Sequence, residues 1–319
     1  MNINKGIRKA GKYFLILVAG LMALFLAGWL ILYFKSPGKT EPFVDEHGKT
    51  ISNSISTIEK IELGGIEQYL IIRGVDSSKP VLLFLHGGPG STDLGFVKKF
   101  NPGLEHDFVV VHWEQRGSGK SYHENIPIES MNIEQFIADT KELSEYLIRR
   151  FNRDKIYIMG HSWGSYLGMR TIEKHPEFYY CYFGIGQVAN QYRSESLSYE
   201  WVKEQAAQKN DRKAIEKLEA LDFPEIYASS KEWLTFLIAE RSYVDKFGGG
   251  LLRDYEGALD KLLPIINVQE YTLTDKMNYG TGSLFSLEHL WGDIITDNLF
   301  ESIDSVQITV YLLHGAYDY

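Results

Sequence analysis

Cysteine is almost absent from this sequence of 319 residues, because Cys181 is its single example. An intramolecular disulfide is therefore excluded. There is no C-x-x-C or H-E-x-x-H pattern, so the sequence offers no basis for a metal site. Basic residues are outnumbered by acidic ones, 33 to 42, and the net charge of −9 argues against a nucleic-acid partner. The remaining composition, 44% hydrophobic and 24% charged, is typical of a globular protein.

Charge is also missing from one long segment near the N-terminus. Residues 13–34 are uncharged and almost wholly apolar, and a helix needs about 20 such residues to cross a bilayer. We therefore expect a transmembrane anchor at 13–34 after a basic cytoplasmic tail at 1–12. The tail carries Lys5, Arg8, Lys9 and Lys12. These basic residues favour an N-terminus on the cytoplasmic side of the cell membrane and a main domain on the opposite side.

A cleaved signal peptide is the alternative for this segment. Its apolar core would be about 7–15 residues long and would end in an A-x-A-like site. The run at 13–34 is longer and leaves through Tyr33, Phe34 and Lys35, which favours the anchor. Residues 35–50 are polar and predict a tether to the following domain.

Strands and helices alternate from residue 51 to residue 186. Apolar alternation on both sides of Gly64 and Gly65 predicts a β-hairpin, and 81–88 and 107–117 are continuously apolar runs typical of buried parallel strands. Residues 132–151 have helical spacing, with Asn132 and Gln135 expected to form a capping box. This rhythm predicts an α/β protein with a doubly wound, mostly parallel sheet.

The rhythm breaks between residues 187 and 298, where charged helical patterns follow one another without a buried strand. We expect this stretch to form a helical cap over the carboxyl edge of the sheet. Strand character returns at 306–313, so 51–186 is the first part of the core and 299–319 is an incomplete second part.

The motif G-x-S-x-G places Ser162 between a predicted strand and a predicted helix. Gly160 and Gly164 allow the tight turn that would lift the serine hydroxyl above the sheet. The other interpretation, a merely structural glycine-rich turn, fits this context less well. Ser162 is therefore the expected nucleophile.

The motif HGGPG at 86–90 follows an earlier strand. Acyl transfer creates an oxyanion that needs fixed hydrogen-bond donors. With this pairing of motifs the donors are expected to be the backbone N–H groups of Gly88 and Trp163, with Gly87 leaving room for the approach. For His86 we expect a buried hydrogen-bonding brace.

LHGGPG, WEQRGSGKS and GHSWGS, in this order, resemble the proline iminopeptidase family of α/β-hydrolases, serine peptidase family S33. The resemblance runs from about Leu63 to the end, although 187–298 matches the family's cap only loosely. It implies Ser162 as nucleophile, Gly88 and Trp163 as oxyanion donors, Asp318 as the acid of a catalytic triad, and Arg116 as a brace for its loop. It implies no metal or organic cofactor.

Selectivity for a free amine would require a buried acid in the cap, because a desolvated ammonium must be paired. Glu240 is the candidate from sequence, although a solvated position on its helix is the more ordinary expectation. An esterase or lipase with the same core remains open.

A triad of this kind continues from the acid to a histidine, but only Tyr319 follows Asp318. His289 is the one other histidine whose position does not argue against it. We expect a C-terminally truncated copy or partial record of a hydrolase, inactive or nearly so as written.

The sequence thus predicts a membrane-anchored serine hydrolase acting through an acyl-enzyme, with an aminopeptidase activity on small peptides as the first interpretation. The expected partners are a small peptide or ester and the membrane. A non-catalytic pseudo-hydrolase that binds ligands under its cap is the remaining alternative.

Overall fold

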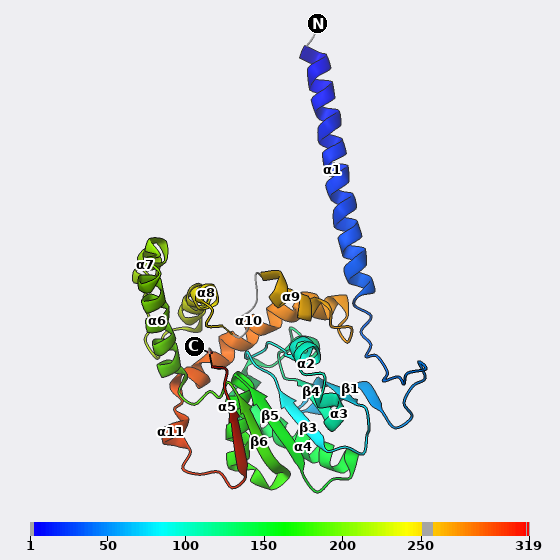
Figure 1. Cartoon of the computed structure of the whole chain (residues 1–319), viewed down its shortest axis with the longest axis vertical. Coiled ribbons are helices and arrows are strands. Elements are labelled where there is room, and N and C mark those ends of the chain that lie inside the picture. The colour runs from blue at the N-terminus through cyan, green and yellow to red at the C-terminus, as the bar shows by residue number, and fades with distance from the viewer. Residues whose placement is uncertain (1–2, 251–257, 317, 319) are drawn as a thin grey trace.

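The structure is a computed structural model that describes residues 3–250, 258–316 and 318. A seven-stranded sheet forms its centre, with helices on both faces and a helical cap at one edge (Figure 1). The strand order is β1-β2-β4-β3-β5-β6-β7. The strands are β1 (Ile55–Leu63), β2 (Ile66–Gly74), β3 (Val81–Leu85), β4 (Val109–Glu114), β5 (Ile156–His161), β6 (Tyr179–Ile185) and β7 (Thr309–Leu313).

The sheet is antiparallel at one side and parallel elsewhere. β1 pairs with β2 as the predicted hairpin, with Leu63 opposite Ile66, and β2 is antiparallel to β4. All later pairings are parallel. The expected doubly wound, mostly parallel sheet is therefore confirmed.

Helices of the core cover the two faces because the buried strands present apolar side chains on both. Leu83 and Leu85 belong to the main apolar cluster under α4 and α5, whereas Phe84 packs with Val97 of α2 on the opposite face. The core helices are α2 (Leu94–Phe100), α3 (Leu104–Asp107), α4 (Ile133–Phe151) and α5 (Trp163–Lys174), with single 3₁₀ turns at Gly119–Ser121, Ile128–Ser130 and Pro176–Phe178.

The N-terminus of α4 corrects one detail of the sequence prediction. The Asn132 side chain accepts a hydrogen bond from the backbone N–H of Gln135, as expected for a cap. The Gln135 side chain does not return to Asn132, because it donates to Asp139 at 2.7 Å. The reciprocal half of the capping box is thus replaced by a contact with a buried carboxylate.

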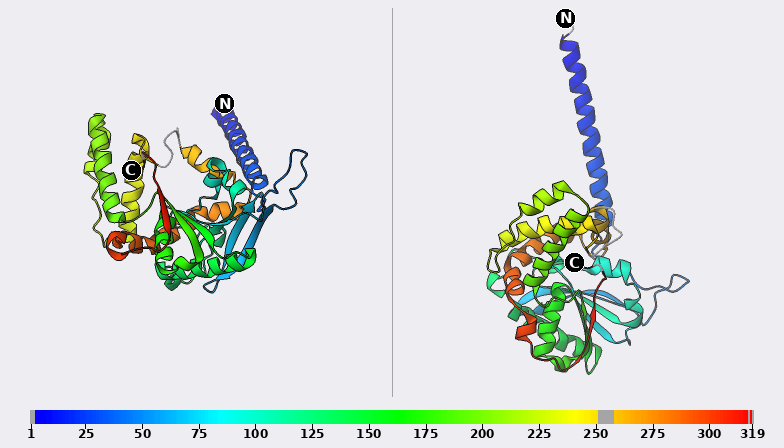
Figure 2. Two further views of the ribbon diagram at one scale, coloured as in Figure 1. Left: turned by 60° about the horizontal axis from the view of Figure 1, so that its bottom comes forward. Right: turned by 60° about the vertical axis from the view of Figure 1, so that its left-hand side comes forward.

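The region between 187 and 298 is helical in the part that the structure describes. Its helices are α6 (Gln191–Gln208), α7 (Arg212–Glu219), α8 (Ser230–Phe247), α9 (Ala258–Ile266) and α10 (Leu273–Thr296), followed by α11 (Leu299–Ser302). The cap meets loops at the carboxyl ends of the strands, where Ser286 of α10 donates to the Gly117 carbonyl at 3.0 Å. Two further views show α6, α8 and α10 above that edge (Figure 2).

The N-terminal helix α1 (Ile3–Phe34) projects away from the domain. Its segment Gly11–Phe34 is long and apolar enough to cross a membrane, with a mean hydropathy of 2.7 and no buried residue. The segment after it, expected to be a polar tether, lies against the domain over its first part. The guanidinium of Arg73 donates to the Glu41 carbonyl at 2.8 Å and stacks over the Phe43 ring.

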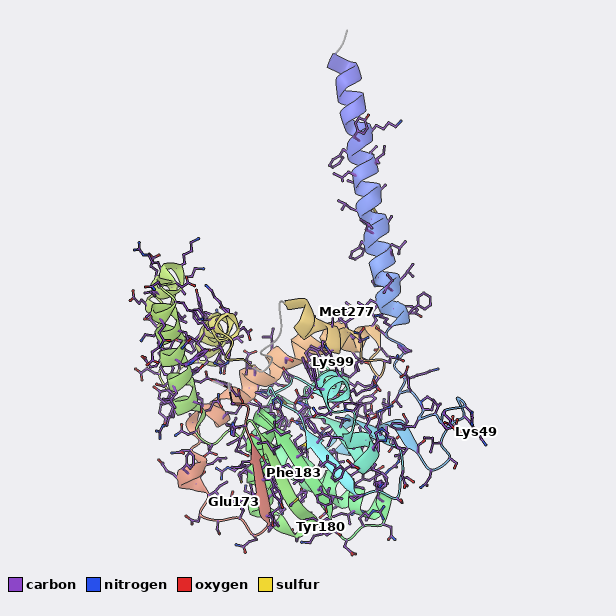
Figure 3. The ribbon with its side chains drawn as sticks, viewed as in Figure 1. Lys49, Lys99, Glu173, Tyr180, Phe183 and Met277 are labelled. Atoms are coloured by element: carbon purple, nitrogen blue, oxygen red, sulfur yellow. The ribbon has the colours of Figure 1, made fainter. Side chains whose placement is uncertain are left out.

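β7 lies at the edge of the sheet beside β6, as expected for the strand that leads to Asp318. Tyr311, Leu312 and Leu313 are exposed, and the Tyr311 ring stacks on Phe183 of β6. Figure 3 shows Phe183 and Tyr180 at this end of the molecule, opposite the side from which α1 rises.

Candidate active site

Ser162 lies on a sharp turn between β5 and α5. Its backbone has φ 52° and ψ −119°, a conformation that L-residues rarely adopt. The flanking glycines are sterically required: a Cβ on Gly160 would lie 2.2 Å from the Gly164 carbonyl oxygen, and one on Gly164 would lie 2.1 Å from that of Leu85. The local structure is thus the strained strand-to-helix turn predicted from the motif.

The loop after β3 places a second set of backbone groups beside this turn. The Gly87 N–H donates to the Asp93 carboxylate at 2.9 Å. For the N–H groups of Gly88 and Trp163 there is no hydrogen-bond partner among the described residues. Trp163 is the first residue of α5, so its N–H has no intrahelical acceptor. Both residues line the same cavity as Ser162.

His86 is buried behind this loop. Its Nδ1 lies 2.8 Å from the Gly87 carbonyl oxygen, and its Nε2 lies 2.9 Å from the Ser118 hydroxyl. Burial lowers the pKa of His86, which keeps the imidazole neutral at neutral pH. Gln115 joins the two loops, because its side chain donates to the His86 carbonyl and accepts from the Trp163 indole at 2.9 Å.

Sequence reasoning missed Asp93, which connects the loop to the turn. Its Oδ2 accepts the Gly87 N–H and lies 2.8 Å from Nδ1 of His161, the residue before the nucleophile. Burial alone would lower the pKa of His161, but the Asp93 carboxylate and, to a smaller extent, the Asp318 carboxylate outweigh burial and raise it. The pair therefore fixes the Gly87 peptide and His161 together. No motif marked Asp93, since it lies beyond HGGPG in an ordinary loop.

A cavity of about 230 Å³ opens above Ser162, between core and cap. Its lining combines apolar side chains with one acid, Glu195, and one base, Arg241. The lining residues are Gly88, Ser162, Trp163 and Val188, together with Gln191, Glu195, Leu237, Arg241, Leu287, Trp291 and Ile294 of the cap.

Glu195, a fully buried carboxylate, lines this cavity together with Arg241, whereas the equally buried Glu240 is not among the lining residues. The Arg241 guanidinium donates to both Glu195 oxygens at 2.6 and 2.7 Å and also pairs with Glu240. Glu240 accepts a further hydrogen bond from Ser198 at 2.5 Å, and burial raises the pKa of its carboxyl. The expectation of a solvated Glu240 is wrong, because this arginine and hydroxyl make its burial tolerable. Glu195 gave no signal in the sequence.

Asp318 lies at the carboxyl end of β7, at the same edge of the sheet as Ser162. Its Oδ2 is 3.5 Å from the position a Cβ would take on Gly186, and its backbone N–H donates to the Gly315 carbonyl at 3.3 Å. Within the described residues, no histidine is hydrogen-bonded to Ser162 or to Asp318. His289 is held instead by the Phe285 carbonyl in α10, at 2.8 Å.

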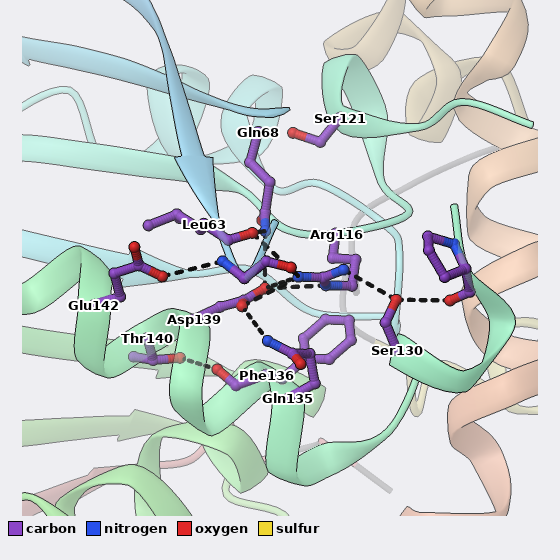
Figure 4. Close-up of polar contacts among 12 residues, drawn as sticks. Leu63, Gln68, Arg116, Ser121, Ser130, Gln135, Phe136, Asp139, Thr140 and Glu142 are labelled. Atoms are coloured by element: carbon purple, nitrogen blue, oxygen red, sulfur yellow. Dashed lines mark hydrogen bonds and ion pairs between the residues drawn. The ribbon is translucent and has the colours of Figure 1, made fainter. Parts of the chain in front are cut away.

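Arg116 of the EQRG motif is buried and is not among the residues that line the cavity; Figure 4 shows its polar contacts. Its Nε donates to Asp139 of α4 at 3.0 Å, and its Nη2 donates to the carbonyls of Leu63 and Gly64 at 3.2 and 3.1 Å. The side chain thus ties the loop after β4 to the β1–β2 turn and to α4.

Glu114, one residue before Gln115, is buried and its pKa is raised to about 7 by burial. Tyr271 and the Lys120 N–H donate to its carboxyl at 2.8 and 3.1 Å. Because the folded-state pKa lies above the unfolded value near 4.5, the protonated carboxyl stabilises the fold. That stabilisation is full below about pH 4.5 and is lost as the pH rises through about 7.

We therefore expect the free energy of unfolding to fall between pH 5 and pH 8 by up to about 3 kcal/mol on account of this group. Glu114→Gln should remove this part of the pH dependence, since an amide does not titrate. Urea unfolding of both proteins in detergent at the two pH values measures the difference. Identical pH profiles for the two proteins would contradict the assignment to Glu114.

No cluster of three or more potential metal ligands is found in the described part of the chain.

Comparison with known proteins identifies a family and several relatives that share the fold. Residues 80–318 match the family model described as alpha/beta hydrolase fold. The chain is 34% identical over 267 residues to the probable aminopeptidase YbaC of Bacillus subtilis (strain 168), covering 83% of this chain and 82% of that protein.

Two further relatives are more distant. A proline iminopeptidase of Lactobacillus helveticus (strain DPC 4571) is 31% identical over 119 residues, which cover 37% of this chain and 39% of that protein. The crystal structure of the proline iminopeptidase of Mycobacterium smegmatis superposes with a TM-score of 0.56 at 16% identity, over 82% of each chain. That structural likeness shows the fold alone.

Proposed function

The chain belongs to the α/β-hydrolase family, and on that premise we propose that it is a serine aminopeptidase of the proline iminopeptidase type. Its hydrolase class is supported by the aminopeptidase-named relative that matches most of its length. The proposed substrates are small peptides with a free N-terminal amine. The observation that carries this choice is the buried Glu195 carboxylate, which lines the same cavity as Ser162 and pairs with Arg241.

Two acids, Glu195 and Glu240, share the one guanidinium of Arg241, and of these only Glu195 also lines the cavity. A substrate ammonium in the cavity would pair with the Glu195 carboxylate. The apolar side, with Leu237, Leu287 and Trp291, would receive the side chain or ring of the N-terminal residue.

The proposed chemistry begins with attack by the Ser162 oxygen on the carbonyl carbon of the first residue. The N–H groups of Gly88 and Trp163 would stabilise the oxyanion that forms. Collapse of this intermediate breaks the C–N bond, and the departing amine takes a proton. Water then hydrolyses the acyl-enzyme and restores the hydroxyl.

Proton transfer is assigned to a histidine oriented by Asp318. The described residues do not supply it, so we propose slow turnover for the 319-residue chain. The intact mass of the natively expressed protein tests whether a histidine follows Tyr319. A mass that ends at Tyr319 would favour the pseudo-hydrolase alternative.

Binding tests the amine preference without depending on turnover. With full-length Ser162→Ala in detergent, prolyl-alanine should bind about 10- to 100-fold more tightly than N-acetyl-prolyl-alanine, because acetylation removes a charge-assisted contact. Glu195→Gln in the same background should remove most of this preference. Titration calorimetry measures the affinities of both peptides for both variants.

Glu200→Gln is the matched control, because Glu200 is exposed on the same helix α6. It should leave both affinities unchanged. Equal binding of the free and acetylated peptides, or binding of neither, would argue against the aminopeptidase. Hydrolysis of a short-chain ester by the unmodified chain would then favour the esterase alternative.

We further propose that α1 anchors the protein in the membrane with its basic N-terminus inside and the hydrolase domain outside. The length, apolar composition and lack of burial of Gly11–Phe34 support the anchor, and a signal sequence is the competing interpretation. Lys5, Arg8, Lys9 and Lys12 support the orientation.

A further inference from the structure

The junction between α1 and the hydrolase domain is short and structured. The Lys35 N–H donates to the Ile31 carbonyl and the Ser36 hydroxyl to the Leu32 carbonyl, so helical bonding continues past Phe34. Pro37 then forms a β-bridge with Thr272, the residue before α10. Because each residue extends at most about 3.5 Å and a bridge adds about 5 Å, Thr272 lies within about 15 Å of the end of the apolar helix.

Side chains fasten this junction to the cap. Lys35 Nζ donates to the Asn267 side chain at 3.0 Å, and the Lys39 N–H donates to the Gln269 carbonyl at 3.0 Å. Lys276 of α10 donates to the carbonyls of Lys35 and Ile266 at 2.8 and 2.6 Å. The end of α1 is therefore held beside α9 and the start of α10, as Figures 1 and 2 both show.

Large apolar side chains are exposed on this side of the domain. Leu262 and Leu263 of α9 are 48% and 42% exposed, and Met277 of α10 is 71% exposed. Figure 3 places Met277 next to the foot of α1 and Lys99 of α2 just below it. Apolar side chains grouped with lysines are typical of surfaces that lie at a lipid interface.

Among the side chains that the structure describes here, the exposed charges around these residues are mainly basic. Lys35, Lys39 and Lys99 are exposed there, while the nearby Glu270 is buried and paired with Lys98, and Asp275 is paired with Lys120. Lysines close to a bilayer are attracted to lipid phosphates, by about 1 kcal/mol each at an anionic surface. The charge of this face thus complements a lipid surface.

We propose that this face, defined by Leu262, Leu263, Met277, Lys39 and Lys99 and called the juxtamembrane face, lies on the bilayer surface. The inference rests on the proposed anchor, because α1 fixes how close the face can be to lipid. The apolar side chains enter the boundary between headgroups and acyl chains, and the lysines contact phosphates. The hydrolase domain is therefore held in one orientation on the membrane.

The candidate active site shares helix α10 with this face of the domain. The N-terminal half of that helix carries Met277 and the junction, while its C-terminal half supplies Leu287, Trp291 and Ile294 to the cavity above Ser162. One wall of the substrate cavity is thus part of a helix seated on the membrane.

Fluorescence quenching in vesicles tests the proposal on the full chain. Cys181, buried in β6, is replaced by alanine, and single cysteines at positions 29, 262, 277 and 180 carry an environment-sensitive dye. The vesicles contain phosphatidylcholine and phosphatidylglycerol, with or without lipid bearing a nitroxide near the top of its acyl chain. Tyr180 is the matched control, since it is 49% exposed and lies on the far side of the domain.

Positions 262 and 277 should lose at least about three times as much fluorescence as position 180, because only lipid-embedded dyes approach the nitroxide. Position 29, within α1, reports on the anchor separately. Quenching at 29 with 262 and 277 no more quenched than 180 would overturn the juxtamembrane face while leaving the anchor intact. Absence of quenching at 29 would overturn both, and the peptide-binding proposal would be unaffected.

Discussion

Ser162→Ala should abolish covalent labelling by a fluorophosphonate probe and the imidazole-dependent part of the hydrolysis of a prolyl-amide reporter. Ser162 combines a strained backbone, an orientation toward the cavity and two unpaired backbone donors beside it. Those features have a catalytic use only if its hydroxyl attacks a carbonyl or phosphoryl centre. Labelling is measured as the mass of the intact protein after reaction with the probe.

Both measurements are made with imidazole in the buffer. The described residues bring no histidine to the Ser162 hydroxyl, and a serine without a base is a weak nucleophile. A diffusible base takes over part of the proton transfer, so the rate should rise with imidazole concentration in the unmodified chain and not in Ser162→Ala.

Ser242→Ala is the control, because Ser242 is an exposed serine of α8 outside the cavity. It should label at the rate of the unmodified chain. Labelling of Ser162→Ala at that rate would show that the probe reacts elsewhere, and the acyl-enzyme mechanism would be lost. The amine-binding cavity would then remain as the site of a pseudo-hydrolase.

The sequence predicted features that depend on neighbouring residues. The turn at Ser162 follows from glycines two positions away on each side, and the β1–β2 hairpin follows from alternation around Gly64 and Gly65. In both cases the steric reason lies within one short segment. Such local requirements are visible in a single sequence.

The pairing of Glu195 and Glu240 around one arginine could not be predicted in this way. Glu195 and Glu240 lie on different helices, α6 and α8, and each has the surroundings of an ordinary solvated acid in the sequence. Their burial depends on Arg241 and on the packing of the two helices. The contact of residues 37–39 with the cap could not be predicted from the sequence for the same reason, because the two segments are more than 200 residues apart in the chain.

The largest loss of stability is expected from Asp139→Ala. Asp139 and Arg116 are both fully buried and paired at 3.0 Å, and Gln68 and Gln135 also donate to the same carboxylate, at 2.8 and 2.7 Å. Removing the acid leaves a buried guanidinium without its counter-charge, which costs about 3–5 kcal/mol. For a domain of this size, that corresponds to a fall in Tm of roughly 10 °C.

Lys141→Ala provides the control on the same helix, because Lys141 pairs with Glu145 at 2.7 Å on the surface of α4. Its loss should cost less than about 1 kcal/mol. The double variant Arg116→Met with Asp139→Leu should be more stable than Asp139→Ala, since it leaves no unpaired buried charge. If Asp139→Ala and Lys141→Ala instead lower the free energy of urea unfolding by the same amount, the network in Figure 4 contributes little to stability. Arg116 would then need a role in the active site.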